Sequence, residues 1–158
     1  MRLPARIPRD VPKVPERRRD GDDPKYLAWL GTLPSLLTGR EPCDVVHHLM
    51  RAVNDDGTRA HRGHGIKNMD RYGLPIEHWF HSACHGTGDD EALMASLGFD
   101  ARGICSSLWG MRNWADRDEY ARNLIFRARQ QARLKTDDWS AKIAQLAQKY
   151  AGPGITQI

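Results

Sequence analysis

The sequence has few of the features that mark secreted or membrane-bound proteins. Its 158 residues include only three cysteines, Cys43, Cys84 and Cys105, which are too scattered for a disulfide framework. It has no apolar run of about 18 residues, the length that a membrane-spanning helix needs. Residues 1–22 also lack the apolar core of a signal peptide. We therefore expect a cytoplasmic protein with no membrane partner and with reduced thiols.

Histidine is missing from most of the chain. All seven histidines fall between residues 47 and 85, and the arginine-rich C-terminal segment has none. Imidazole is the commonest nitrogen ligand for divalent metals, so this concentration predicts a metal site. The net charge of +4 is a modest tilt toward anionic partners, nucleic acid first.

The pattern along the chain predicts a mainly α protein with a small β-hairpin. Residues 1–22 mix proline with arginine, lysine and aspartate, which is typical of a flexible basic arm. We expect a main domain over 23–110 and a helical extension over 111–151. In the first helix, Asp23 can act as the N-cap and Pro24 suits the first position. Helices are expected within 22–34, 74–86 (after Pro75), 89–98, 100–110, 116–135 and 137–152.

A pair of adjacent histidines follows a short apolar run. The stretch SLLTGREPCDVVHHLM (residues 35–50) predicts a hairpin with its turn at 39–42. Because side chains alternate along a strand, His47 and His48 should point to opposite faces. His81 and His85 are four residues apart, so they share one helical face. A strand histidine and two helix histidines would form a three-sided cage with open positions, as catalytic metals need.

Further basic residues lie in the long polar segment 51–73 and at the start of the next helix. Arg62, Lys67 and Arg71 could contact phosphates, although solvated loop charges are the alternative. His78 precedes His81 by three residues. It could be a spare metal ligand, but we favour a group that supports the ligands or faces phosphate.

The order of these motifs resembles the core of the HNH, or ββα-metal, nucleases. The similarity is to phage recombination nucleases of the Ref type and to related prophage HNH proteins, and it covers residues 24 to about 109. It implies a His-Me finger core and a metal-dependent DNA endonuclease of phage or prophage origin, acting in a bacterial host cell. The motifs are His47-His48-Leu49, Gly63-x-Gly65-x-Lys67-x-x-Asp70, Leu74-Pro75 and His81-x3-His85.

The resemblance also implies roles for individual residues. His48 would be the general base that activates water, and the spacing alone leaves open whether His47 or His48 has this role. The residue that orients the base would be Asp70, preferred over Asn68 and Tyr72. One divalent ion (Mg, Mn, Zn or Ni) would be bound by His47, His81 and His85, and DNA would be contacted by Arg62, Lys67, Arg71 and His78.

The chain departs from the resembled family at its structural zinc site. Glu77 stands where that family often has a cysteine, so we expect no structural zinc, with the hairpin held by apolar packing. Two other interpretations remain open. One is a non-catalytic nucleic-acid-binding protein on a degenerate HNH scaffold, and the other is a zinc-containing adaptor. The C-terminal helices could also serve a partner or self-association, and the sequence does not indicate the oligomeric state.

Overall fold

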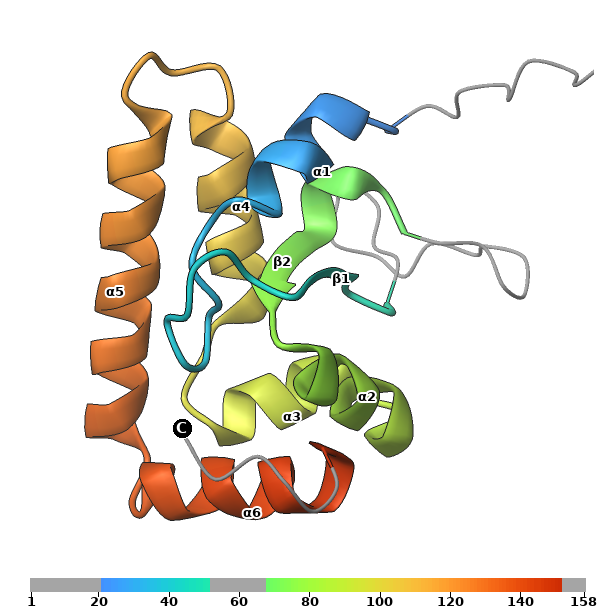
Figure 1. The fold of residues 1–158 in the computed structure, drawn as a ribbon, viewed down its shortest axis with the longest axis vertical. Helices are drawn as coiled ribbons and strands as arrows, with labels where there is room; N and C mark the ends of the chain where they lie inside the picture. Colours follow the sequence, from blue (N-terminus) through green and yellow to red (C-terminus); the bar gives the residue numbers. More distant parts are fainter. Residues whose placement is uncertain (1–20, 52–67, 152–158) are drawn as a thin grey trace, which may run out of the picture.

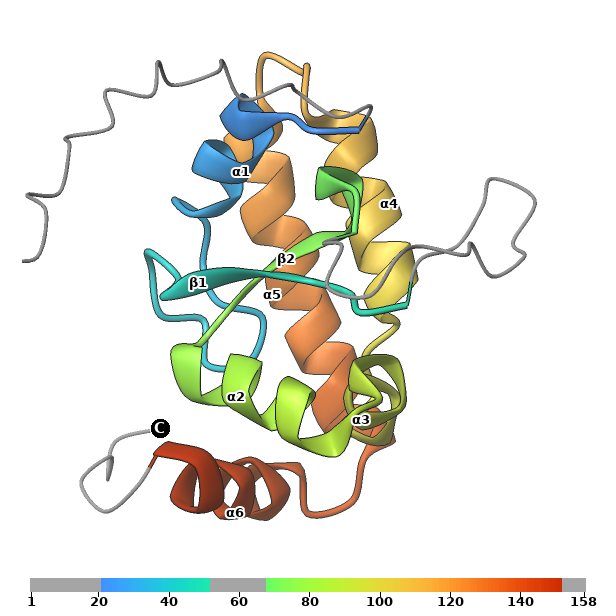
Figure 2. The ribbon, with the colours of Figure 1, turned by 90° about the vertical axis from the view of Figure 1, so that its right-hand side faces the viewer.

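The computed structural model describes residues 21–51 and 68–151, which form a mainly helical structure around a small antiparallel sheet (Figure 1). Turned by 90°, the two strands cross in front of α5 and lie above α2, with α6 beneath (Figure 2). The elements are α1 (Pro24–Leu30), β1 (Val45–His48), the 3-10 turn η1 (Asp70–Tyr72), β2 (Gly73–Ile76), α2 (His78–Thr87), α3 (Asp90–Ser96), α4 (Ala101–Met111), α5 (Arg117–Lys135) and α6 (Trp139–Ala151).

The sheet pairs different segments from those that the sequence suggested. Strand β1 pairs with β2, and Val46 lies opposite Pro75 and His47 opposite Leu74. The prediction of a hairpin within 35–50 is therefore wrong, although its second strand is present as β1. The partner strand was missed because Pro75 has no N–H, and a proline in a short apolar run argues against a strand. In a two-stranded sheet one edge of each strand has no strand partner, and a proline whose nitrogen lies on that edge breaks no ladder hydrogen bond.

Residues 33–44 form a compact turn in place of the first strand. Leu36 and Leu37 are fully buried, and the Leu36 N–H donates to the carbonyl of Pro75 at 2.9 Å. Polar contacts hold the turn as well. Glu77, itself buried, accepts hydrogen bonds from the N–H and the hydroxyl of Thr38. The segment is thus attached to β2 and to the start of α2 by both apolar and polar contacts.

The helices begin largely where the sequence indicated. Asp23 accepts a hydrogen bond from the Tyr26 N–H at 3.0 Å, and Asp100 accepts one from the Gly103 N–H, also at 3.0 Å. Both residues are N-caps, as expected, and Pro24 occupies the first turn of α1. The positive φ of Gly98 lets the chain turn between α3 and α4. A Cβ there would lie 2.9 Å from the Cα of Ala132 in α5.

The C-terminal helices share the core of the domain that precedes them. The Trp29 indole of α1 donates to Asp118 of α5 at 2.7 Å. Trp139 at the start of α6 donates to the carbonyl of Leu97 at 3.1 Å. Ile143 and Ala147 are buried, so the apolar face of α6 packs inside the protein. Across 21–51 and 68–151, the helices are all too short or too polar to cross a membrane.

Candidate metal centre and its neighbouring histidine

The two adjacent histidines of β1 lie in different surroundings. His47 is fully buried and faces α2, whereas the side chain of His48 is 10% exposed and contacts Asp70. The separation follows from the strand geometry, because successive side chains leave opposite faces. The sequence predicted it from the alternation alone.

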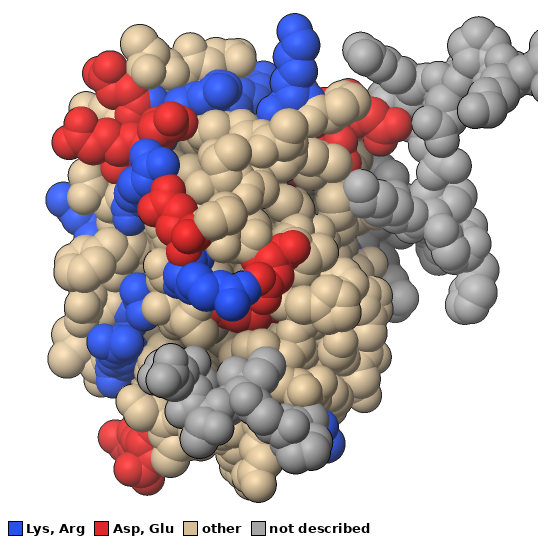
Figure 3. Space-filling model, in the orientation of Figure 1, with Lys and Arg blue, Asp and Glu red and all other residues tan. Residues whose placement is uncertain are grey.

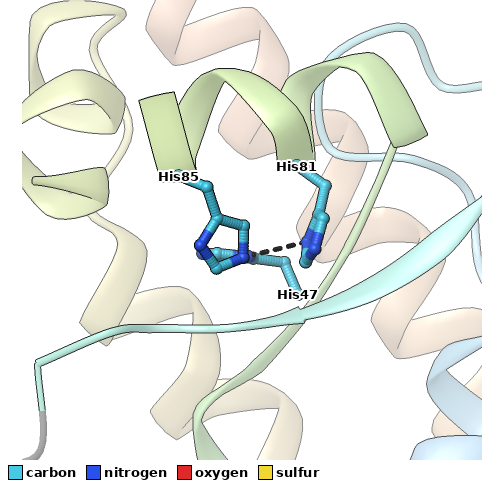
Figure 4. Close-up of side chains that lie close together, drawn as sticks. All are labelled: His47, His81 and His85. Atoms are coloured by element: carbon cyan, nitrogen blue, oxygen red, sulfur yellow. Dashed lines mark hydrogen bonds between the residues drawn. The ribbon is translucent and has the colours of Figure 1, made fainter. Parts of the chain in front are cut away.

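His47, His81 and His85 come together between β1 and α2 (Figure 4). His81 and His85 lie one helical turn apart on α2 and point toward the strand, from which His47 reaches up to meet them. One ligand nitrogen from each ring can be chosen so that all three lie within 4.8 Å of one another. The three residues that the sequence proposed as ligands therefore form a cluster that could hold a metal ion.

The distance between two rings of the cluster is close to that between two ligands of one ion. The Nδ1 atoms of His47 and His81 are 3.1 Å apart. With zinc–nitrogen bonds of about 2.0–2.1 Å at a tetrahedral angle, two ligand nitrogens would be separated by about 3.3–3.4 Å. Burial decreases from His47 through His81 to the exposed His85. The cluster consequently opens toward solvent on the His85 side, where coordination positions could be taken by water or a substrate oxygen.

The pKa of His81 also suits metal binding. Burial lowers the pKa of His81, and the neighbouring imidazoles of His47 and His85 lower it further. Neutral imidazole is the form that coordinates metals. The cluster therefore favours the ligating form of the histidine at its centre.

Asp90 is a member of the site that the sequence analysis missed. It is 1% exposed, and its Oδ2 lies 2.8 Å from Nε2 of His47 and accepts the Met50 N–H at 2.8 Å. Burial acts to raise the pKa of Asp90, but the hydrogen bonds from His47 and Met50 outweigh it and hold the pKa below its usual value. The sequence offers one indication of such a role: two aspartates, Asp89 and Asp90, stand at the start of a helix that needs only one of them as its N-cap. Asp89 is that cap, accepting the Ala92 N–H at 3.0 Å.

On the other face of β1, His48 is held by a buried carboxylate. Its Nε2 lies 2.9 Å from Oδ1 of Asp70, which is 3% exposed. The second oxygen of Asp70 accepts the Asp23 N–H at 2.7 Å, which fixes the carboxylate against the start of α1. Asn68, an alternative orienting residue, instead donates to the carbonyls of Leu49 and Arg51. Asp70, the preferred candidate, is thus in contact with His48.

The remaining candidate residues have varied surroundings. Arg71 donates to the Tyr72 hydroxyl at 2.8 Å and lies over the Tyr72 ring. His78 is exposed at the start of α2, with its ring centroid 6.4 Å from that of His81, at the rim of the cluster. Arg62 and Lys67 lie outside the described residues.

Arginines of α5 largely bind groups of the protein itself. Arg122 pairs with Glu41 at 2.6 Å, and Arg129 donates to the carbonyls of Leu37 and Thr38. On the face in Figure 3, basic and acidic side chains alternate instead of forming a continuous basic patch. Two further arginines of α5 lie over aromatic rings: Arg117 over Trp29 and Arg133 over Trp139.

Comparison with known proteins does not assign this chain to a family. No family model matches the sequence, and neither a curated protein nor a solved structure gives a significant match. The functional conclusion consequently depends on the geometry of the two histidine sites.

Proposed function

We propose that the protein is a metal-dependent DNA endonuclease of the ββα-metal type. The observation that carries the proposal is the combination of the two sites on one strand. A three-histidine cluster lies on one face of β1, and on the other face His48 is hydrogen-bonded to the buried Asp70. The order β1, β2, α2, with ligands from β1 and α2, supports the same assignment.

In this proposal, His47, His81 and His85 hold one divalent ion. Imidazole ligands suit Zn²⁺ and Ni²⁺ better than Mg²⁺ and Mn²⁺, which prefer oxygen ligands. When bound, the ion would polarise the scissile phosphate and stabilise the leaving oxygen. The exposed side of the cluster, near His85, would be the approach for the phosphate.

His48 would act as the general base. An ionised carboxylate can only accept hydrogen bonds, so the contact with Asp70 places the ring proton of neutral His48 on Nε2. Nδ1 is then the unprotonated nitrogen, which would take a proton from the attacking water. Asp70 would hold the ring in this orientation and stabilise the imidazolium that forms, as carboxylates do beside catalytic histidines.

The test is cleavage of supercoiled plasmid by the wild type and by His48→Ala, with Mg²⁺, Mn²⁺, Zn²⁺ or Ni²⁺, or with EDTA. We expect nicking that requires a divalent ion and falls by about 10²–10⁴-fold in His48→Ala, the usual contribution of a general base. Metal binding by His48→Ala, measured by calorimetry, should stay at the wild-type level. If the wild type binds DNA but never cuts it, a non-catalytic binding protein replaces the proposal.

A further inference from the structure

We propose that Asp90 is a positioning residue that fixes the His47 ring with Nε2–H toward Asp90 and the Nδ1 lone pair toward the metal position. The inference rests on the proposed function for its assumption that the histidine cluster binds an ion. It adds a residue from α3 to a site that otherwise consists of side chains from β1 and α2.

The burial of Asp90 is the first observation. A carboxylate that leaves water loses its hydration, so it must be compensated by hydrogen bonds. Asp90 accepts three: from His47 Nε2 and the Met50 N–H at Oδ2, and from the Glu91 N–H at Oδ1. Its neighbour Asp89 already caps α3. Asp90 is therefore not needed as the cap, and its side chain is directed to His47 instead.

The choice of tautomer follows from the chemistry of the pair. The carboxylate has no proton to donate, so the 2.8 Å contact requires that His47 carry its proton on Nε2. The other ring nitrogen, Nδ1, then has a lone pair, and it points to Nδ1 of His81 at 3.1 Å. Without metal, the Nδ1–H of His81 would donate a hydrogen bond to Nδ1 of His47. When metal binds, neutral His81 would carry its proton on Nε2, so both Nδ1 lone pairs could coordinate.

Asp90 also fixes the end of the ligand strand. The oxygen that contacts His47 accepts the Met50 N–H, so one carboxylate holds both the ring and the backbone two residues after β1. A carboxylate behind a ligand histidine sets the orientation of the ring and raises its basicity, and its loss usually lowers metal affinity by about 10–100-fold. We expect a loss of metal affinity in this range when Asp90 is replaced.

The experiment compares full-length wild type, Asp90→Asn, Asp90→Ala and the control Asp89→Asn. Asp89→Asn makes the same chemical change one residue earlier, at a position where asparagine caps as well as aspartate. The first measurement is the ¹⁵N chemical shifts of the imidazoles in the metal-free protein, which report the tautomer of each ring. The second is the dissociation constant for Zn²⁺ by calorimetry.

We expect the His47 ring of the wild type to carry its proton on Nε2, and Asp90→Ala to show a mixture of tautomers. Zinc affinity should fall by about 10-fold in Asp90→Asn and up to about 100-fold in Asp90→Ala, with Asp89→Asn within twofold of the wild type. If Asp90→Ala does not fold, Asp90→Asn and the wild-type tautomer still test the inference.

A wild-type His47 with its proton on Nδ1, or an Asp90→Asn variant with unchanged zinc affinity, would overturn the inference. A wild type that binds no zinc would overturn it too, together with the metal site. If the tautomer and the affinities follow expectation but no metal supports DNA cleavage, the proposed nuclease function fails while the role of Asp90 stands.

Discussion

Replacing Asp70 by asparagine should slow DNA cleavage while leaving the metal cluster intact. The carboxylate uses one oxygen for His48 Nε2 at 2.9 Å and the other for the Asp23 N–H at 2.7 Å. An amide has only one acceptor oxygen and an NH₂ that can only donate, so in Asp70→Asn either the Asp23 N–H or the Nε2–H of His48 loses its acceptor. The contact between the Asp70 carboxylate and His48 becomes an ion pair as the ring takes up a proton, and hydrogen bonds to charged groups contribute about 1.5–3 kcal/mol.

Because Asp70 is 3% exposed, solvent should replace little of that loss. The expected fall in the cleavage rate is therefore between about 10-fold and about 150-fold. Single-turnover nicking of supercoiled plasmid, with enzyme in excess, measures the rate without a contribution from product release. Zinc affinity by calorimetry should match the wild type, because Asp70 contacts His48 and not the cluster.

The matched control is Asp100→Asn, which makes the same change at the exposed N-cap of α4. Its cleavage rate should equal that of the wild type, since asparagine is an equally good cap. If Asp70→Asn cleaves at the wild-type rate while His48→Ala is inactive, Asp70 does not orient the base. If Asp70→Asn instead loses zinc binding, the substitution also changes the structure of the histidine cluster, and the argument from one hydrogen bond is wrong.

Three further predictions follow from contacts of individual residues. His85→Ala should weaken zinc binding measured by calorimetry, because it removes one of three ligands, and unchanged affinity would exclude His85 from the site. Arg129→Ala removes a half-buried guanidinium and leaves the carbonyls of Leu37 and Thr38 without this donor, so it should lower the free energy of unfolding in urea by about 1–2 kcal/mol. The exposed Arg127→Ala should change it by less than about 0.5 kcal/mol. Burial raises the pKa of Cys84 to about 12, so this thiol should resist Ellman's reagent at pH 8 in the native protein and react once the chain is unfolded in guanidinium. Rapid native labelling of Cys84 would contradict its burial.

The raised pKa values of the buried thiols predict that the free energy of unfolding falls as the pH becomes alkaline. In the unfolded chain a cysteine ionises near its ordinary pKa, whereas burial raises the pKa values of Cys43, Cys84 and Cys105 in the folded protein. Above the ordinary value the unfolded state releases protons that the folded state retains. The contribution of these thiols is thus fully present below that pH and is lost as the pH rises through the alkaline range. Replacing Cys105 by alanine should reduce this alkaline loss in urea titrations.

The parts of the fold that the sequence predicted depend on local chemistry. The N-caps Asp23 and Asp100 and the shared face of His81 and His85 are set by residues within one or two turns of each other. The partner of β1 could not be found in this way, because β2 lies more than 20 residues later and contains Pro75. The choice of Asp70 over Asn68 agrees with the observed contact, but only the fold brings that carboxylate to His48.

Asp90 shows why part of the site was not predictable. In the sequence it is the second of two acidic residues at the start of a helix, a pattern that usually reflects capping and the helix dipole. Its role depends on the fold, which places the start of α3 next to His47 and brings residues 43 positions apart to within 2.8 Å. Residue type therefore indicated the three histidines that form the cluster, whereas the buried carboxylate beside them could be found only in the tertiary structure.

The helices after residue 110 are also relevant to the site, although the family resemblance does not extend to them. Helix α2, which carries His81 and His85, packs against α6, and a Cβ on Gly86 would lie 2.8 Å from the Tyr150 ring. Helix α2 is thus covered on the Gly86 side by α6, which follows it much later in the chain. Because α6 buries Ile143 and Ala147 in the same core, a substitution there would be transmitted to the ligand helix through packing. The C-terminal helices thus support the helix that carries two histidines of the cluster, in addition to completing the fold.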